Sequence, residues 1–144
     1  MITSKAGIDL IAHYEGCKLK AYKPVKSEKY YTIGYGHYGA DVSKDMTITK
    51  QQAIDMLAAD LKKFERIVER NCKHLNLNVN EFSALVSFTY NCGEGNLQRL
   101  IRGRSKAVIA QKILLYNKAG GKQLAGLVKR RKSEQMLYLT GEWK

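Results

Sequence analysis

The 144-residue chain has little acidic charge, a single proline and three cysteines, and these shortages narrow the protein classes to which it can belong. The chain has 13 acidic residues and 25 lysines and arginines, so its formal net charge is +12. The positive electrostatic field of such a chain predicts attraction to polyanions: nucleic acid, an anionic membrane or an acidic bacterial envelope. Cys17, Cys72 and Cys92 cannot all pair within one chain and lack metal-ligand spacing, so free thiols in a reducing compartment are expected.

Long hydrophobic runs, repeats and low-complexity tracts are also absent. No stretch approaches the ~20 apolar residues that span a bilayer. Charged residues interrupt the apolar residues of Met1–Tyr14, whereas a signal peptide contains a continuous apolar run. The chain is therefore expected to fold in a cytoplasm as one domain, because its 144 residues suffice for one core but not for two independent ones.

The first third of the sequence predicts a helix followed by a hairpin. Thr3 or Ser4 can cap an apolar helix that Gly16 ends. Alternating and aromatic residues over 19–36, interrupted by a polar turn, are typical of two strands. The residues after Gly36 are expected to continue as a loop.

The rest of the chain has helical periodicity. A long helix is expected over residues 49–71, and a buried central helix should begin near Asn80 and stop at Gly93 and Gly95. Two or three further helices, broken at Gly120–Gly121, should complete the chain. One hairpin with helices elsewhere predicts an α+β protein with a mostly helical body.

Glu15, at the end of the first helix, is the first candidate for chemistry. A carboxylate at a helix C-terminus faces the negative end of the helix dipole, so its ionisation is disfavoured. A carboxyl group that keeps its proton can act as a general acid. On spacing alone, however, a solvated helix-end carboxylate is the commoner interpretation.

A wider pattern of short motifs extends along nearly the whole chain. It begins with Glu15-Gly16, Leu19, Ala21-Tyr22 and Thr32-Ile33-Gly34-Tyr35-Gly36-His37. Further segments follow along the chain: Asp41-Val42, Ile48-Thr49, Ala84-Leu85-Val86-Ser87-Phe88, Asn91-Cys92-Gly93, Gly126-Leu127, Arg130-Arg131 and Glu134. Together, and in this order, these segments resemble those of phage-type lysozymes, the endolysins of glycoside hydrolase family 24.

The resemblance implies a lysozyme-like α+β fold, and no cofactor or metal site is visible in the sequence. A small hairpin-bearing lobe (about 12–60) and a mainly helical lobe (1–11 with 61–144) would be joined by the long helix, with the cleft between them. The implied activity is that of a muramidase, which cuts the β-1,4 bond between N-acetylmuramic acid and N-acetylglucosamine in peptidoglycan. A related lysozyme-like fold cleaves the same bond without water, so a lytic transglycosylase remains an alternative.

By resemblance, Glu15 is the proton donor to the glycosidic oxygen and Thr32 orients the attacking water. Family members commonly carry Asp, or in some branches Cys, nine residues after the acid, where this chain has Pro24. Glu28 is the only acidic residue between Glu15 and His37, and we hypothesise that it supplies the missing negative charge. The alternative is an exposed turn glutamate.

Other family positions suggest support and substrate contacts. The resemblance places His37 against Asp60, as a brace for the hairpin. Asn91 either offers its amide to the sugar or caps its helix. The candidate substrate contacts are Tyr22, Tyr31, Gly36, His37 and Asn91.

Three basic clusters are expected to attract anionic envelope polymers. They comprise Lys18, Lys20, Lys23, Lys26 and Lys29; Arg99, Arg102, Arg104 and Lys106; and Lys129, Arg130, Arg131 and Lys132. A nucleic-acid-binding protein or an inactive wall-binding module remains an alternative, although no nucleic-acid-binding signature is present. A monomer is expected. The resemblance implies that it waits in the host cytoplasm until a holin opens the membrane and then acts on the cell wall.

Overall fold

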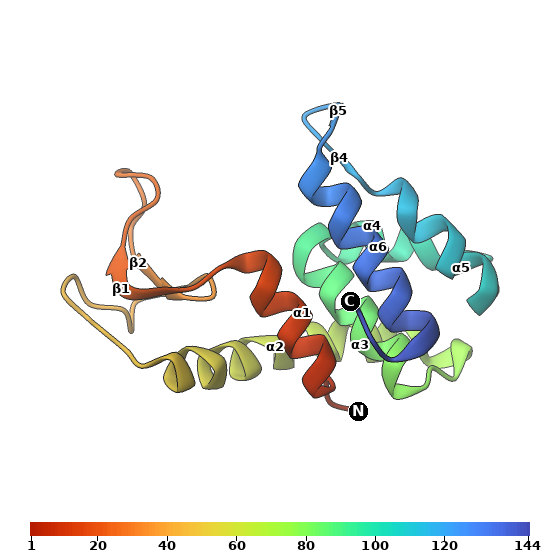
Figure 1. Cartoon of the computed structure of the whole chain (residues 1–144), viewed down its shortest axis with the longest axis horizontal. Helices are drawn as coiled ribbons and strands as arrows, with labels where there is room; N and C mark the ends of the chain where they lie inside the picture. Colours follow the sequence, from red (N-terminus) through yellow and green to blue (C-terminus); the bar gives the residue numbers. More distant parts are fainter. The chain divides into compact units, whose positions relative to one another are not determined.

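The computed structural model describes all 144 residues and confirms the α+β class (Figure 1). The chain divides into two compact units, Ile11–Asp60 and Met1–Leu10 with Leu61–Lys144. The helices are α1 (Lys5–Glu15), α2 (Lys50–Cys72), α3 (Val79–Cys92), α4 (Glu94–Ile101), α5 (Lys106–Lys112) and α6 (Ala125–Thr140), with 3-10 turns η1 (Lys73–Leu75) and η2 (Ile113–Leu115). The strands are β1 (Lys18–Tyr22), β2 (Tyr31–Gly34), β3 (His37–Gly39), β4 (Lys118–Ala119) and β5 (Lys122–Gln123).

Helix α1 has the start and the end that the sequence predicts. Of the two candidate caps, Ser4 is the one that acts, because its Oγ accepts a hydrogen bond from Gly7 N at 3.1 Å. Gly16 follows the last helical residue with φ +71°, a conformation that glycine adopts without steric cost. The chain thus leaves Glu15 as the final residue of the helix and enters β1 two residues later.

The unit Ile11–Asp60 contains a three-stranded antiparallel sheet in the order β1-β2-β3. Lys18 lies opposite Gly34 and Tyr22 opposite Thr32, so β2 returns toward the end of α1. Buried Ala21 of β1, Ile33 of β2 and Val42 form a small core. The sheet therefore has its own small hydrophobic core, and packing in this core stabilises the position of β2.

Helix α2 begins as expected after Thr49. Thr49 Oγ1 accepts a hydrogen bond from Gln52 N at 3.1 Å, and Gln52 Oε1 accepts one from Thr49 N at 2.8 Å. This reciprocal arrangement is a capping box, which satisfies two backbone donors at the start of the helix.

The second unit is built around α3, the central helix that the sequence predicts. Every residue from Glu81 to Thr89 is buried, and α3 packs against α6 and α4. Asn78 and Glu81 form a capping box at its start, and Glu81 also accepts a hydrogen bond from Lys106 Nζ at 3.0 Å. No helix in the structure combines the length and apolar character needed to cross a membrane.

Two predictions of local structure were wrong, and one element was not foreseen. Residues 37–39 form strand β3 rather than loop. Gly95 does not stop a helix but lies in the first turn of α4, whose apolar residues are buried. Gly120–Gly121 separates helices as predicted, but it does so as the two-residue turn of a second hairpin, β4–β5, which the sequence analysis did not foresee.

Candidate functional site

The two residues assigned to catalysis lie in the same unit, on adjoining elements. Glu15 ends α1 and is partly exposed. Thr32 is a buried residue of the central strand β2, paired with Tyr22 on one side and Tyr38 on the other. Because Lys18 pairs with Gly34, the register directs the end of β2 toward the segment that follows Glu15.

Glu28 belongs to the loop that joins β1 to β2. Its Oε1 accepts a hydrogen bond from Val25 N at 3.2 Å, and its own N–H donates to Val25 O at 3.1 Å. Pro24, at the position of the family's usual second acid, is an exposed residue of the same loop. The geometry thus gives the Glu28 carboxylate a role in holding its own turn.

Three candidate contact residues lie on or beside the sheet. Tyr22 is exposed on β1, and Gly36 is exposed in the turn between β2 and β3. Tyr31 packs on the small core, with Lys23 Nζ 4.8 Å from its ring centroid. A cation over an aromatic face is an attractive arrangement, so Lys23 helps to fix this edge of the sheet.

His37 contacts two carboxylates. Its Nδ1 lies 2.8 Å from Asp60 Oδ2, which confirms the expected pair, and its Nε2 lies 2.9 Å from Asp41 Oδ2. Burial alone would lower the pKa of His37, but the hydrogen bonds to Asp60 and Asp41 outweigh it and raise the pKa above its ordinary value. Since both ring nitrogens are engaged, the structure gives His37 a bracing role between β3 and α2 rather than a free nitrogen for substrate.

Replacing Asp60 with asparagine is expected to lower the pKa of His37 and to weaken the unit. The stabilisation from a raised histidine pKa is complete below the unfolded value of ~6.5 and fades as pH rises through the folded value. The loss in Asp60→Asn should therefore be largest in acid and small in alkali. An NMR titration of the ring with melts at several pH values tests this, and Asp55→Asn, on the same helix, is the control. An unchanged titration would contradict the bracing role.

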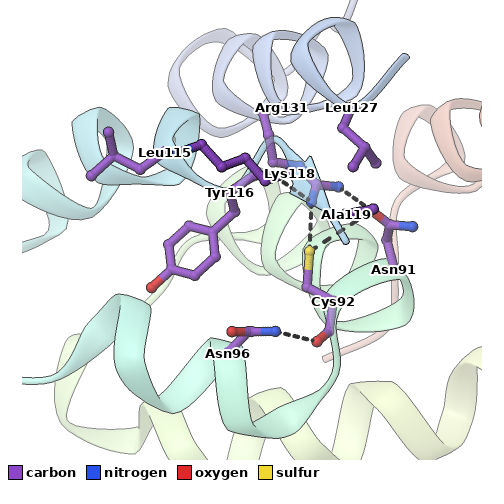
Figure 2. Close-up of a pocket in the computed structure, with 9 residues that line it drawn as sticks. All are labelled: Asn91, Cys92, Asn96, Leu115, Tyr116, Lys118, Ala119, Leu127 and Arg131. Atoms are coloured by element: carbon purple, nitrogen blue, oxygen red, sulfur yellow. Dashed lines mark hydrogen bonds between the residues drawn. The ribbon is translucent and has the colours of Figure 1, made fainter. Parts of the chain in front are cut away.

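Asn91 lies near the end of α3, beside a pocket of about 410 Å³ (Figure 2). The pocket is lined by Asn91, Cys92, Asn96, Leu115, Tyr116, Lys118, Ala119, Leu127 and Arg131. The helix is capped by Gly93, whose N–H donates to Thr89 O, so the Asn91 side chain does not cap it. Instead, Asn91 Oδ1 accepts a hydrogen bond from Arg131 Nη2 at 2.9 Å.

The third basic cluster was partly wrong, because Arg130 and Arg131 are buried. Arg131 Nε lies 2.7 Å from Glu134 Oε1, and Arg130 Nε donates to Glu134 Oε2 at 3.3 Å. Ser87 of α3 donates to the same Oε2 at 2.5 Å. Burial raises the pKa of the Glu134 carboxyl, while both guanidinium groups act in the opposite direction.

Sequence reasoning therefore missed the buried ion pairs, although a signal was present. Glu134 follows Arg131 by three residues and Arg130 by four, the spacing at which helical side chains meet. Ser87, a polar residue within the apolar central helix, marks the opposite partner. Together these positions predict an internal polar network rather than a solvated basic face.

The cysteines are free, as expected. Burial raises the pKa of the Cys72 thiol to about 11. Burial also raises the pKa of Cys92, although the adjacent Arg131 guanidinium partly offsets this effect. Both thiols are consequently protonated and weakly nucleophilic near neutral pH.

Comparison with known proteins identifies relatives along nearly the whole chain. The endolysin of Bacillus phage PZA is 48% identical over 147 residues, which cover 98% of this chain and 56% of that protein. The endolysin of Salmonella phage P22 is 32% identical, with 97% of this chain and 99% of that protein covered. The chain thus spans about half the length of the Bacillus phage relative.

A solved structure and a family profile agree with these relatives. The endolysin from Escherichia coli O157:H7 phage FAHEc1 superposes with a TM-score of 0.81 at 35% identity, covering 100% of this chain and 97% of that one. The profile described as phage lysozyme matches residues 12–134. That range includes Glu15, Thr32, the His37 brace and the Asn91 pocket, and the chain is therefore a member of the phage lysozyme family.

Proposed function

We propose that the chain is a muramidase that hydrolyses the β-1,4 bond between N-acetylmuramic acid and N-acetylglucosamine in peptidoglycan, and that it serves as an endolysin in host lysis. The observation that carries the proposal is the placement of Glu15 at the end of α1, with Thr32 on the strand that returns toward it, within a phage lysozyme chain. A second solved relative, 32% identical with a TM-score of 0.79 and covering 95% of this chain and 97% of that one, is the muramidase domain of SpmX from Asticaccaulis excentricus.

In the proposed reaction Glu15 donates its proton to the glycosidic oxygen. The sugar oxygen leaves poorly unless it is protonated while oxocarbenium character develops at the anomeric carbon. The Thr32 hydroxyl orients the water that adds to that carbon. Glu28 would bring its negative charge to the reaction only by giving up the hydrogen bond that it accepts from Val25 N. Its contribution to the rate of hydrolysis is therefore partial at most.

Each unit by itself has proposed substrate contacts. In the unit Ile11–Asp60 the proposed glycan contacts are exposed Tyr22 on β1, half-buried Tyr31 on β2 and exposed Gly36 in the turn after β2. Asn91 contributes a carboxamide from the helical unit. His37 takes part indirectly, through the brace that positions β3.

The proposed envelope attraction rests on the first basic cluster. Lys18, Lys20, Lys26 and Lys29 are all exposed on β1 and the loop after it. Together with the net charge of +12 they create a positive field that would raise the encounter rate with anionic wall polymers and that salt would screen. By resemblance, a holin would release the protein from the host cytoplasm to the wall, where a single chain acts.

A second candidate reaction follows from Pro24, which removes the usual second carboxylate. In a lytic transglycosylase the muramic acid's own hydroxyl attacks in place of water and yields an anhydro sugar. Retention of Thr32 favours hydrolysis.

Digestion of purified peptidoglycan tests the proposed reaction. We expect falling turbidity and muropeptides with hydrated reducing ends, identified by mass spectrometry. A dominant anhydromuramyl product would assign transglycosylation instead. The absence of cleavage, together with tight binding to walls or to duplex DNA, would replace the enzyme with a binding protein.

A further inference from the structure

Arg131 uses its guanidinium group to join four partners around the pocket in the helical unit. Its side chain is fully buried. Nε and Nη2 face Glu134, at 2.7 Å from Oε1 and 3.1 Å from Oε2. Nη2 also donates to Asn91 Oδ1 at 2.9 Å, and Nη1 donates to Cys92 Sγ at 2.6 Å and to Tyr116 O at 3.3 Å. The guanidinium therefore cannot rotate without losing several contacts at once.

This arrangement fixes which way the Asn91 carboxamide points. Arginine has donors and no acceptor, so the Asn91 atom that faces it must be the oxygen. The Cys92 thiol donates to the same oxygen, at 3.8 Å, so both of its lone pairs are used. A flipped amide would place N–H groups against a cation and give up a charge-assisted bond, which is roughly twice as strong as a neutral one.

The other end of the carboxamide is available to a ligand. Asn91 is an exposed residue that lines the pocket, and Figure 2 shows its nitrogen turned away from Arg131. Nδ2 donates to no atom of the protein, whereas the second asparagine of the pocket, Asn96, donates its amide to Cys92 O at 2.8 Å. The pocket therefore offers two N–H donors from one fixed side chain.

We propose that Arg131 is a positioning residue that holds Asn91 as an obligatory donor, and that the pocket consequently takes a carbonyl oxygen of peptidoglycan. The inference rests on the proposed function and adds to it the chemistry of one contact. Acetamido groups of the glycan and peptide bonds of the stem both carry such an oxygen.

Replacing Asn91 with aspartate isolates the donor. Aspartate keeps an oxygen for Arg131 but puts a second acceptor where Nδ2 was. We expect KM for peptidoglycan to rise roughly tenfold with little change in kcat, the pattern of a lost binding contact. Gln123→Glu is the matched control, since it adds the same negative charge on exposed β5, outside the pocket lining, and should leave KM unchanged. An unchanged KM in Asn91→Asp would overturn the proposal.

Arg131→Lys separates positioning from support of the fold. Lysine keeps the charge beside Glu134 but cannot reach Asn91 and Cys92 in the same fork geometry. KM should therefore rise in the wild-type background and change little in the Asn91→Asp background, where the donor is already absent. The fall in melting temperature should be similar in both backgrounds. Independent, multiplicative effects on KM would show that Arg131 does not act through Asn91.

Two substrates identify the source of the carbonyl. Intact peptidoglycan carries the carbonyl oxygens of both acetamido groups and stem peptides. Glycan strands whose stem peptides have been removed by an amidase carry only those of the acetamido groups. A KM penalty on both substrates supports an acetamido contact, and a penalty confined to intact peptidoglycan supports a stem-peptide contact. Failure of the wild type to cleave either substrate would contradict the proposed function itself, whereas normal cleavage by Asn91→Asp at normal KM would contradict this inference alone.

Discussion

Glu15→Gln should abolish lysis while leaving the chain folded. Glutamine has nearly the same shape as glutamic acid but no acidic proton to give to the glycosidic oxygen. General acid catalysis contributes about 10²–10⁴-fold, so the rate of peptidoglycan cleavage should fall by about that factor. Turbidity loss, with reducing ends quantified on purified walls, measures the change, and circular dichroism establishes that the variant is folded.

Two other glutamates provide matched controls for Glu15. Glu142→Gln alters an exposed residue near the end of the chain and should retain full activity. Glu28→Gln should lose activity partially at most, because the carboxylate accepts a bond from Val25 N in its own loop. Thr32→Ala should lose hydrolysis in the same assay. Full activity of Glu15→Gln would overturn the proposed mechanism.

Capping residues and apolar periodicity were sufficient to predict most of the helices. Ser4 and Thr49 start α1 and α2 as expected, because a side-chain oxygen next to an apolar stripe is a local signal. The buried central helix could also be predicted from the sequence, because a helix with apolar residues on nearly all of its surface is stable only inside a core.

The missed elements are short and depend on their surroundings. Helix α4 has only eight residues and contains Gly95, so its local propensity is low, and burial of Leu97, Leu100 and Ile101 stabilises it. Strands β4 and β5 have two exposed residues each and no alternating pattern. Their signal was the Gly-Gly turn, whose φ values of +58° and +80° fit a two-residue hairpin.

The candidate site residues were chosen for a different reason. Glu15, Thr32 and His37 lie in the most family-specific part of the sequence, so the resemblance suggested them, and the contact of His37 with Asp60 is the part that the structure confirms. The sequence suggested a role for Asn91 but not the pocket that it lines, because the geometry of that pocket depends on Arg131. An arginine in a basic run is usually solvated, and its burial follows from the partners that α3 and α6 bring together.

Glu134→Gln should cause the largest loss of stability among conservative substitutions in this chain. Glu134 is fully buried and is contacted by Arg130, Arg131 and Ser87. The amide removes the negative charge and directs N–H groups toward two buried guanidinium groups. Removing one partner of a buried ion pair costs about 3–5 kcal/mol in the free energy of unfolding.

That cost is a large share of the total stability of about 5–15 kcal/mol that is typical of a domain. At roughly 2–4 °C per kcal/mol for a chain of this size, the melting temperature should fall by about 10 °C. Calorimetry or denaturant unfolding measures the change, with Glu142→Gln as the exposed control. A loss below about 1 kcal/mol, the range of a surface ion pair, would mean that Arg130 and Arg131 find solvent or other anions and that the network does not organise the packing of α6 on α3.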